Sequence, residues 1–450
     1  MKKGVILLII VAFSFDVSAQ NETAMKFAGT ITKEDLYGHL SILASDALEG
    51  RETGKRGQKM AAAYIRAHFQ ALGLRGPLDG KYFQAFNLEK SSPSETYVMV
   101  GTEKKINGKD ILYWGKNTTN GEITIPAVYV GNANHLDKLD LQDKAVIMTL
   151  RGSFSLFREK KEEAMKKGAS LVIINNTESQ EELDELITSW QNFIMRSSLG
   201  FEAKKGENTG GVIFMSPENT AAILGTKVEK LDKVVKEQEE GGELAHQKIK
   251  EGKITYKTTR IVQTVQTENV LGFLEGTDKK DEIVVVTAHY DHIGIKDGKI
   301  NNGADDDGSG TSSLLEIAEA FVKAKEEGNG PRRSMLFMTV TGEEKGLLGS
   351  QYYVENPVFP LENTVVDLNI DMIGRIDPEH EDNTNYVYLV GSDRLSSELH
   401  EISEKVNDTF TQFDLDYTYN KEDHKDRIYY RSDHWNFAKN NVPIIFYFNG

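Results

Sequence analysis

The sequence lacks cysteine altogether, and its formal net charge is -16. Without cysteine the chain forms no disulfide, binds no metal through thiolates, has no cysteine nucleophile and carries no lipid on cysteine. Histidine, aspartate and glutamate remain as metal ligands. The negative charge argues against a nucleic-acid partner, because nucleic-acid binding needs a positive surface.

Familiar single-segment catalytic motifs are also absent. The sequence contains no His-Glu-x-x-His, no Gly-x-Ser-x-Gly elbow and no phosphate-binding P-loop. The 450 residues are 39% hydrophobic and 27% charged, which is enough for a large buried core and predicts two or three structural units.

Long hydrophobic runs are missing as well. The apolar stretch 5–15 is too short to span a bilayer comfortably. It follows Lys2 and Lys3 and precedes Val17-Ser18-Ala19, a small-residue cleavage pattern. We expect a signal peptide over 1–19, export to the periplasm or the extracellular space, and no stable membrane anchor after cleavage. The alternative is an N-terminal membrane anchor.

Hydrophobic periodicity divides the rest of the chain. Residues 32–73 have helical spacing, and 20–94 are expected to form an N-terminal helical part of the main domain. Residues 95–262 are expected to form an inserted domain, with strands at 127–130, 145–150, 171–174 and 212–215, helices near 159–167 and 217–224, and a long strand over 253–267.

The main domain is expected to resume at 263–450. Strands are predicted at 283–287, 335–340, 365–370, 386–390 and 442–448, with a helix over 309–326. This alternation predicts an α/β fold, a three-layer sandwich with a mostly parallel mixed sheet, accompanied by a smaller inserted α+β domain.

Histidine and carboxylate side chains gather in four short segments, 288–292, 303–310, 341–344 and 369–372. Three follow predicted strands and one begins a predicted helix, so they should converge at the carboxyl edge of the sheet. Clustered carboxylates need a cation, and a mixture of His and carboxylate without Cys suits zinc. Of the adjacent Glu343 and Glu344, one can bind metal while the other accepts a proton from a metal-activated water.

Each segment also has an ordinary structural interpretation. His289 alone could be a core or surface histidine, residues 305–307 could be an acidic loop capping a helix, and Glu343-Glu344 could be a charged loop. Asp371 is harder to dismiss, because it ends an apolar strand where an unpaired charge is costly. The four together favour a metal site.

The run AHYDH … GADDDGSG … TGEEKGLLGS … NIDMIG resembles the co-catalytic zinc exopeptidases of the bacterial leucine aminopeptidase and glutamate carboxypeptidase type. The resemblance is strong over 268–450 and loose over 30–90. It implies two zinc ions and a cis peptide between the two aspartates 306 and 307. It assigns the roles as follows: His289 and Asp371 hold one zinc, Asp306 bridges, Glu344 holds the other, Glu343 is the general base, and Asp291 orients His289.

The inserted region also resembles a known module. The stretch DKAVIMTLRG … EEAMKKGASLVIINN is similar to the protease-associated domain that such peptidases often carry. The resemblance implies a binding or gating role, without a catalytic site of its own.

The family has a fifth ligand, a histidine on the second metal, in a loop beyond the last motif of this sequence. We therefore expect the peptidase domain to be truncated at its C-terminus and the second zinc site to lack that histidine. His434 is a possible substitute, but a structural or pocket-wall role is favoured, and His292, His400 and His424 are interpreted as non-ligands. Tyr429 or Tyr430 could stabilise an oxyanion.

These observations predict a secreted zinc metallo-exopeptidase that acts on peptides, with an aminopeptidase favoured. The alternative on the same fold is a carboxypeptidase, for which Arg375 or Arg427 would bind the substrate carboxylate. A receptor-like homologue without activity is another alternative, and an aminoacyl-cyclising enzyme is disfavoured by the inserted domain. The sequence leaves side-chain specificity and oligomeric state open.

Overall fold

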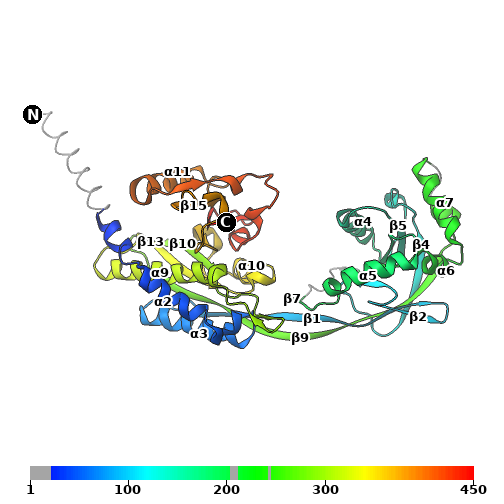
Figure 1. Ribbon diagram of the computed structural model, residues 1–450, viewed down its shortest axis with the longest axis horizontal. Helices are drawn as coiled ribbons and strands as arrows, with labels where there is room; N and C mark the ends of the chain where they lie inside the picture. The colour runs from blue at the N-terminus through cyan, green and yellow to red at the C-terminus, as the bar shows by residue number, and fades with distance from the viewer. Residues whose placement is uncertain (1–21, 203–210, 242–244) are drawn as a thin grey trace, which may run out of the picture. The chain divides into compact units, whose positions relative to one another are not determined.

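The computed structural model describes residues 22–202, 211–241 and 245–450 (Figure 1). The predicted signal peptide, 1–19, lies outside them. The chain forms two compact units, one made of Met1–Leu88 and Val265–Gly450 and the other of Glu89–Thr264. Two long strands, β1 (Phe83–Val100) and β9 (Gly252–Leu274), run from one unit into the other, so the divisions fall inside strands.

The first unit is built on a mostly parallel sheet. Its strand order is β16-β15-β17-β14-β10-β13-β9. The pairs β10–β13, β10–β14, β14–β17 and β15–β16 are parallel, whereas β9 and β15 run antiparallel to β13 and β17. The strands are β10 (Lys279–His289), β13 (Arg333–Val340), β14 (Thr364–Ile370), β15 (Tyr386–Val390), β16 (Asp414–Asp416) and β17 (Ile444–Phe448).

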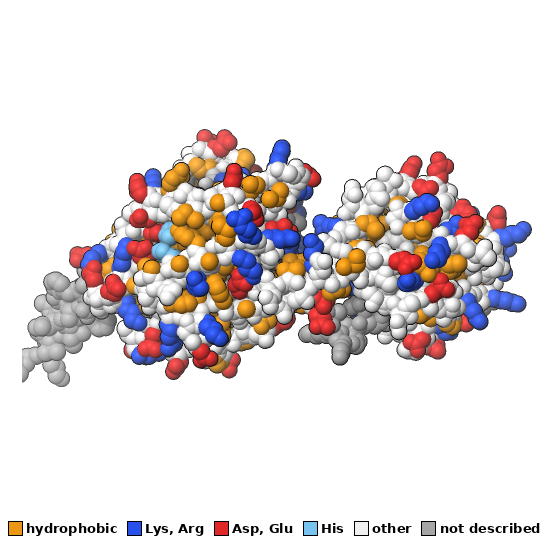
Figure 2. Space-filling view, turned by 90° about the horizontal axis from the view of Figure 1, so that it is seen from below, with side chains coloured by type: hydrophobic (Ala, Val, Ile, Leu, Met, Phe, Trp, Pro, Cys, Tyr) orange, Lys and Arg blue, Asp and Glu red, His pale blue; other side chains and the backbone are white. Residues whose placement is uncertain are grey.

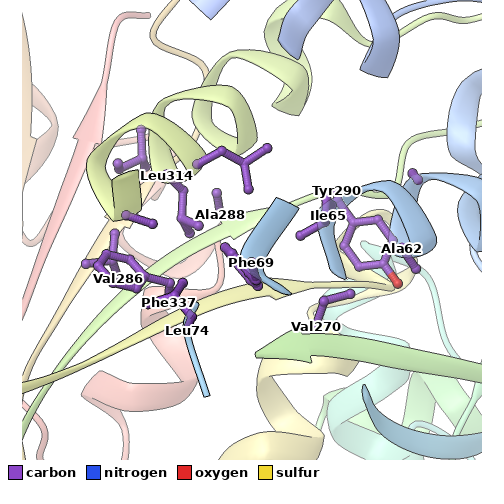
Figure 3. Packing of buried hydrophobic residues seen from close by; sticks show 14 of the residues in the cluster. Ala62, Ile65, Phe69, Leu74, Val270, Val286, Ala288, Tyr290, Leu314 and Phe337 are labelled. Carbon is purple, nitrogen blue, oxygen red and sulfur yellow. The ribbon is translucent and has the colours of Figure 1, made fainter. Parts of the chain in front are cut away.

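Alternate residues of these strands face opposite layers. Val286 and Ala288 of β10 pack with helix α9 (Gly310–Glu326) and helix α3 (Arg56–Ala71), as Figure 3 shows around Phe69 and Leu314. Because side chains alternate along a strand, Val285 points to the other face. There it joins the core with Tyr353 of α10 (Leu348–Glu355) and Phe437 of α12 (His434–Ala438). Helices on both faces make the predicted three-layer α/β sandwich, so the fold class is confirmed.

The N-terminal helical region is interrupted by a short turn that lies against the loop before the acidic segment. Helix α2 (Lys33–Leu43) and helix α3 are separated by a short turn, η1 (Asp46–Arg51), rather than joined. Gly50 has φ +67°, and a Cβ there would lie 2.2 Å from the carbonyl oxygen of Asn301. The turn therefore presses its backbone against the loop that precedes the acidic segment.

The second unit has a mixed sheet with a parallel centre. Strands β4 (Ile123–Tyr129), β5 (Ala145–Thr149), β6 (Leu171–Asn175) and β8 (Gly211–Phe214) pair in parallel, and β3 (Leu112–Trp114) and β9 run antiparallel at the two sides. Apolar cores lie on both faces of this sheet. The associated helices are α4 (Phe154–Lys166), α5 (Gln180–Ile194), α6 (Pro217–Ile223) and α7 (Val228–Glu239).

Surface charge and helix composition were compared with what nucleic-acid binding and membrane insertion require. On the face drawn in Figure 2, acidic and basic side chains are interspersed across both units. Among the described residues, no helix combines the length and the apolar character needed to cross a bilayer.

Candidate metal centre

Parallel pairing brings the predicted ligands to one edge of the sheet. His289 is the last residue of β10, which lies between β13 and β14. Glu343 follows β13 by a two-residue turn, and Asp371 directly follows β14. Asp306 lies in the turn Ala304–Ser309 that leads into α9. Adjacent parallel strands end on the same side, so segments distant in sequence meet there.

His289 lies at the centre of the cluster and is 1% exposed. Its Nε2 lies 3.1 Å from Asp306 Oδ1, 3.4 Å from Asp371 Oδ1 and 3.9 Å from Glu343 Oε2. Its Nδ1 lies 3.0 Å from the backbone carbonyl oxygen of Asp291. A proton on Nδ1 donates to that carbonyl, which leaves the Nε2 lone pair facing carboxylates.

The fit of a cation can be tested on these atoms. His289 Nε2 is buried and forms no hydrogen bond within the described part of the chain. In a tetrahedral zinc site with bonds of about 2.0–2.2 Å, neighbouring ligand atoms lie roughly 3.3 Å apart. The separations of 3.1 and 3.4 Å around Nε2 match this value. The donors are nitrogen and oxygen atoms of the types zinc accepts, so the residues fit the ion.

The charges in the cluster shift the protonation of its members. Burial, with repulsion from Asp371 against attraction by His289, raises the pKa of Glu343 well above its ordinary value. Burial opposes a charged His289 ring, but the Asp371 and Glu343 carboxylates raise its pKa well above the usual range. Burial also opposes ionisation of Asp306, yet His289 keeps the pKa of that carboxyl below its ordinary value. Negative charge is thus in excess, which favours a cation.

A second group of possible ligands adjoins the first. It consists of His292, Asp306 and Glu344, with one ligand atom from each within 4.8 Å of the others. His292 Nδ1 lies 2.7 Å from Glu344 Oε1 and 4.0 Å from Asp306 Oδ2. Asp306 therefore directs one oxygen to each histidine. His292, which the sequence gives no reason to place in the cluster, is thus in contact with Glu344.

Asp307 is also close to the first group, since its carboxylate lies within 4.8 Å of the ligand atoms of His289 and Asp371. Its oxygens are engaged, however. They accept hydrogen bonds from the backbone N–H groups of His289, Gly310 and Met372 at 3.1, 2.8 and 3.2 Å. Asp307 thus ties the end of β10, the start of α9 and the end of β14 together, whereas Asp306 directs Oδ1 to His289. The Asp306–Asp307 peptide is cis, which confirms the expectation from the resemblance.

Asp291 holds neighbouring groups as well as His289. Its carboxylate accepts hydrogen bonds from Thr53 Oγ1 at 2.7 Å and from the backbone N–H of Glu343 at 3.2 Å. Its Oδ1 lies 3.9 Å from His289 Nδ1, so the closer contact with His289 is made by its backbone carbonyl. Burial raises the pKa of Asp291.

Arg51 is a part of the site that the sequence analysis missed. It is fully buried, and its guanidinium donates to the carbonyl oxygens of Tyr290 at 2.7 Å, Asn302 at 2.6 Å and Gly303 at 2.8 Å, and also to that of Leu43. Burial lowers its pKa to about 10, against the attraction of Asp307, Asp291, Asp306 and Glu344. An arginine in a short turn carries no sequence signal of this role.

Asp371 is fixed from behind by a buried polar chain. Ser432 Oγ donates to Asp371 Oδ2 at 2.7 Å and accepts from Asn369 Nδ2 at 2.9 Å. Thr287 Oγ1 lies 2.7 Å from Asn369 Oδ1. Oδ1 of Asp371 is left to face His289.

The remaining predicted residues lie outside the two groups. His434 Nε2 lies 2.8 Å from the Tyr429 carbonyl oxygen, and its ring stacks on Phe446, which is a structural role. Neither His400 nor His424 belongs to either group among the described residues. The ring of Tyr429 lies under Arg394, while Tyr430 packs between Arg427 and Trp435. Arg375 pairs with Asp305 at 3.2 Å.

Comparisons with known proteins agree with this fold. Residues 269–450 match the model of Peptidase family M28. The aminopeptidase YwaD of Bacillus subtilis (strain 168) is 27% identical over 345 residues, covering 75% of this chain and 61% of that protein. A probable glutamate carboxypeptidase of Arthroderma benhamiae is 36% identical over 105 residues, covering 23% of this chain and 14% of that protein. The match thus covers less than two thirds of the length of each of these relatives.

A solved structure has the same fold. The aminopeptidase from Aneurinibacillus sp. strain AM-1 matches with a TM-score of 0.53 and 20% identity, covering 95% of this chain and 87% of that chain. Residues 269–450, which match the model of Peptidase family M28, contain all the predicted ligands and Glu343.

Proposed function

We propose that the protein is a zinc-dependent exopeptidase and that it acts as an aminopeptidase. The observation that carries the proposal is the buried His289 Nε2, which has no hydrogen-bond partner in the described chain and lies 3.1 and 3.4 Å from Asp306 and Asp371. The excess of carboxylates around it favours a resident cation. The match of residues 269–450 to the model of a peptidase family supports a peptide substrate.

Six residues have distinct roles in this proposal. His289 and Asp371 would hold one zinc ion, Glu344 the other, and Asp306 both. When bound, the two ions would polarise the scissile carbonyl and acidify a water molecule. Asp291 positions His289 through its backbone carbonyl and the Glu343 backbone through its carboxylate. Glu343 acts as general base.

The environment of Glu343 suits a group that accepts and returns a proton. Its side chain is 12% exposed, and its Oε2 lies 3.9 Å from His289 Nε2, too far for a hydrogen bond that would occupy it. Burial raises the pKa of Glu343 well above its ordinary value, which strengthens the carboxylate as a proton acceptor. It can take a proton from the attacking water and pass it to the leaving amine.

The similarity to named aminopeptidases supports an aminopeptidase over a carboxypeptidase. One of them, YwaD of Bacillus subtilis, is 27% identical over 345 residues. The two arginines considered for a carboxylate clamp are otherwise engaged, Arg375 with Asp305 and Arg427 with the Tyr430 ring. The similarity to a probable glutamate carboxypeptidase over 105 residues supports the alternative, a carboxypeptidase on the same fold.

Peptides blocked at one end distinguish the two activities. The zinc-loaded protein should release the first residue of a free peptide and of its C-terminal amide, but not that of the N-acetylated peptide. Cleavage of the N-acetylated peptide alone would establish the carboxypeptidase instead. No hydrolysis of any of the three by protein that retains zinc would favour the receptor-like alternative.

Two further proposals rest on the sequence. The N-terminal pattern supports export with removal of residues 1–19, which N-terminal sequencing of the secreted protein would test. The resemblance of the second unit, Glu89–Thr264, to a protease-associated domain supports a binding or gating role. Deleting that unit should then change KM more than kcat.

A further inference from the structure

His292 contacts the metal cluster although it was expected to lie apart from it. It is the last residue of the Ala288-His289-Tyr290-Asp291-His292 segment, three residues beyond His289. Its Nδ1 lies 2.7 Å from Glu344 Oε1 and 4.0 Å from Asp306 Oδ2. Its side chain is 12% exposed, and that of Glu344 is 17% exposed.

The two facing atoms do not satisfy each other. His292 Nδ1 and Glu344 Oε1 are both shielded from solvent, and neither forms a hydrogen bond within the described residues, despite their separation of 2.7 Å. A buried nitrogen and a buried carboxylate oxygen without partners cost free energy unless something else binds them. Their lone pairs are therefore available to a third atom near both.

The spacing of the group suits a cation. Ligand atoms around tetrahedral zinc lie roughly 3.3 Å apart. The distances of His292 Nδ1 to Glu344 and to Asp306, 2.7 and 4.0 Å, lie on either side of that value. Shifts of less than about 1 Å would equalise them. Nδ1 and Nε2 both serve as zinc ligands in proteins, so binding through Nδ1 is ordinary chemistry.

The His292 ring is also held in place. A Cβ on Gly303 would lie 2.6 Å from His292 Cγ, so the ring lies against the backbone of the loop that precedes Asp306. The backbone N–H of His292 donates to the Arg51 carbonyl oxygen at 3.2 Å. The ring is thus fixed by the same turn that positions the other ligands.

We propose that His292 is a zinc ligand through Nδ1, together with Glu344 and the second oxygen of Asp306. Each zinc would then have one histidine and one carboxylate of its own, and share Asp306. The inference rests on the proposed two-zinc centre, but it concerns only which residues complete the Glu344 side.

Zinc titration of the full chain tests the inference. Metal-free wild type, His292→Ala, Glu344→Gln and His424→Ala are titrated with zinc by calorimetry. His424 is the matched control, because its side chain is 18% exposed and it belongs to neither ligand group. We expect two zinc equivalents in wild type and in His424→Ala. His292→Ala and Glu344→Gln should both lose affinity for one equivalent by more than about 100-fold and retain the other.

X-ray absorption at the zinc edge separates a ligand from a residue that only positions Glu344. Wild type with two zinc ions bound should show an average of one imidazole per zinc, from His289 and His292. An average of one half would overturn the inference even if His292→Ala binds zinc weakly or does not fold. Two unchanged equivalents in folded His292→Ala would also overturn it and leave the proposed function intact. Fewer than two equivalents in wild type would contradict both.

Discussion

Arg51 Nε donates a hydrogen bond to the backbone carbonyl oxygen of Tyr290 at 2.7 Å, although 239 positions separate the two residues. The same guanidinium holds the carbonyl oxygens of Asn302 and Gly303, just before the acidic segment. One buried cation therefore joins the loop after His289 to the loop before Asp306. The separation of His289 and Asp306, two of the proposed ligands, therefore depends on Arg51.

We expect Arg51→Lys to damage both stability and zinc binding. Lysine keeps the positive charge but lacks the planar fork, so several buried carbonyls lose their donors. The free energy of unfolding should fall by on the order of 3 kcal/mol, and zinc affinity should fall with it. Denaturant unfolding and zinc titration measure the two effects. Arg56→Lys, at a side chain 71% exposed, should change neither; an Arg51→Lys protein as stable as wild type would disprove the role.

Ser432→Ala tests the support of Asp371. The hydroxyl donates to Asp371 Oδ2 at 2.7 Å and leaves Oδ1 facing His289. Removing such a supporting hydrogen bond typically weakens metal binding by about 10–100-fold. Competition with a chelator should detect this loss, with little change in folding. Ser41→Ala, which removes an exposed hydroxyl bonded to the Gly38 carbonyl, is the control. Equal zinc affinity in the two variants would refute the support.

Glu343→Gln should separate catalysis from metal binding. The amide has nearly the same shape but cannot accept a proton, and loss of a general base costs about 10²–10⁴-fold in kcat. Zinc uptake should be unchanged, because Glu343 is not among the proposed ligands. Release of the first residue from a free peptide is the readout, with Glu355→Gln on the surface of α10 as the control. Wild-type turnover by Glu343→Gln would exclude it as the base.

His434 should make the metal-free protein sensitive to acid. Burial lowers its pKa from 6.5 to about 4 in the folded state. Folding thus favours the neutral His434 ring. The contribution of this ring to the free energy of unfolding is complete above pH 6.5 and is lost as the pH falls to about 4. A shift of this size corresponds to about 3 kcal/mol of unfolding free energy. His434→Phe keeps a ring against Phe446 but cannot titrate.

The comparison of His434→Phe with wild type isolates this group. The difference between their unfolding free energies should be constant above pH 6.5 and should shift in favour of the variant as the pH falls to 4. Urea unfolding at several pH values measures it. Parallel stability curves across that range would mean that His434 titrates normally.

Much of this architecture follows from local patterns. The β-branched run at 283–287 lies in β10, and residues 386–390 match β15 as observed. Strands of this kind are buried and parallel, so their carboxyl ends are expected to lie side by side. This pattern predicted that His289, Glu343 and Asp371 lie close together. The role of Asp306 was predicted from the family resemblance, which rests on the order and spacing of the four motifs.

Other features depend on tertiary contacts that no local pattern encodes. Strand β1 was missed, because its residues 91–95 are polar or proline and lack a clear alternation. Arg51 was missed because its role arises from contacts with residues far away in the sequence, such as Gly303. His292 was interpreted as a non-ligand because its contact with Glu344 likewise depends on the tertiary fold. Asp291 was expected to act on His289 through its carboxylate, whereas its backbone carbonyl makes the closer contact.

Anomalous diffraction at the zinc edge from crystals of the zinc-loaded protein tests the two-zinc centre most directly. The account predicts two peaks at the carboxyl edge of the first unit's sheet. One should contact His289 and Asp371, the other Glu344, and Asp306 should contact both. A single peak, or two peaks away from these four residues, would contradict it.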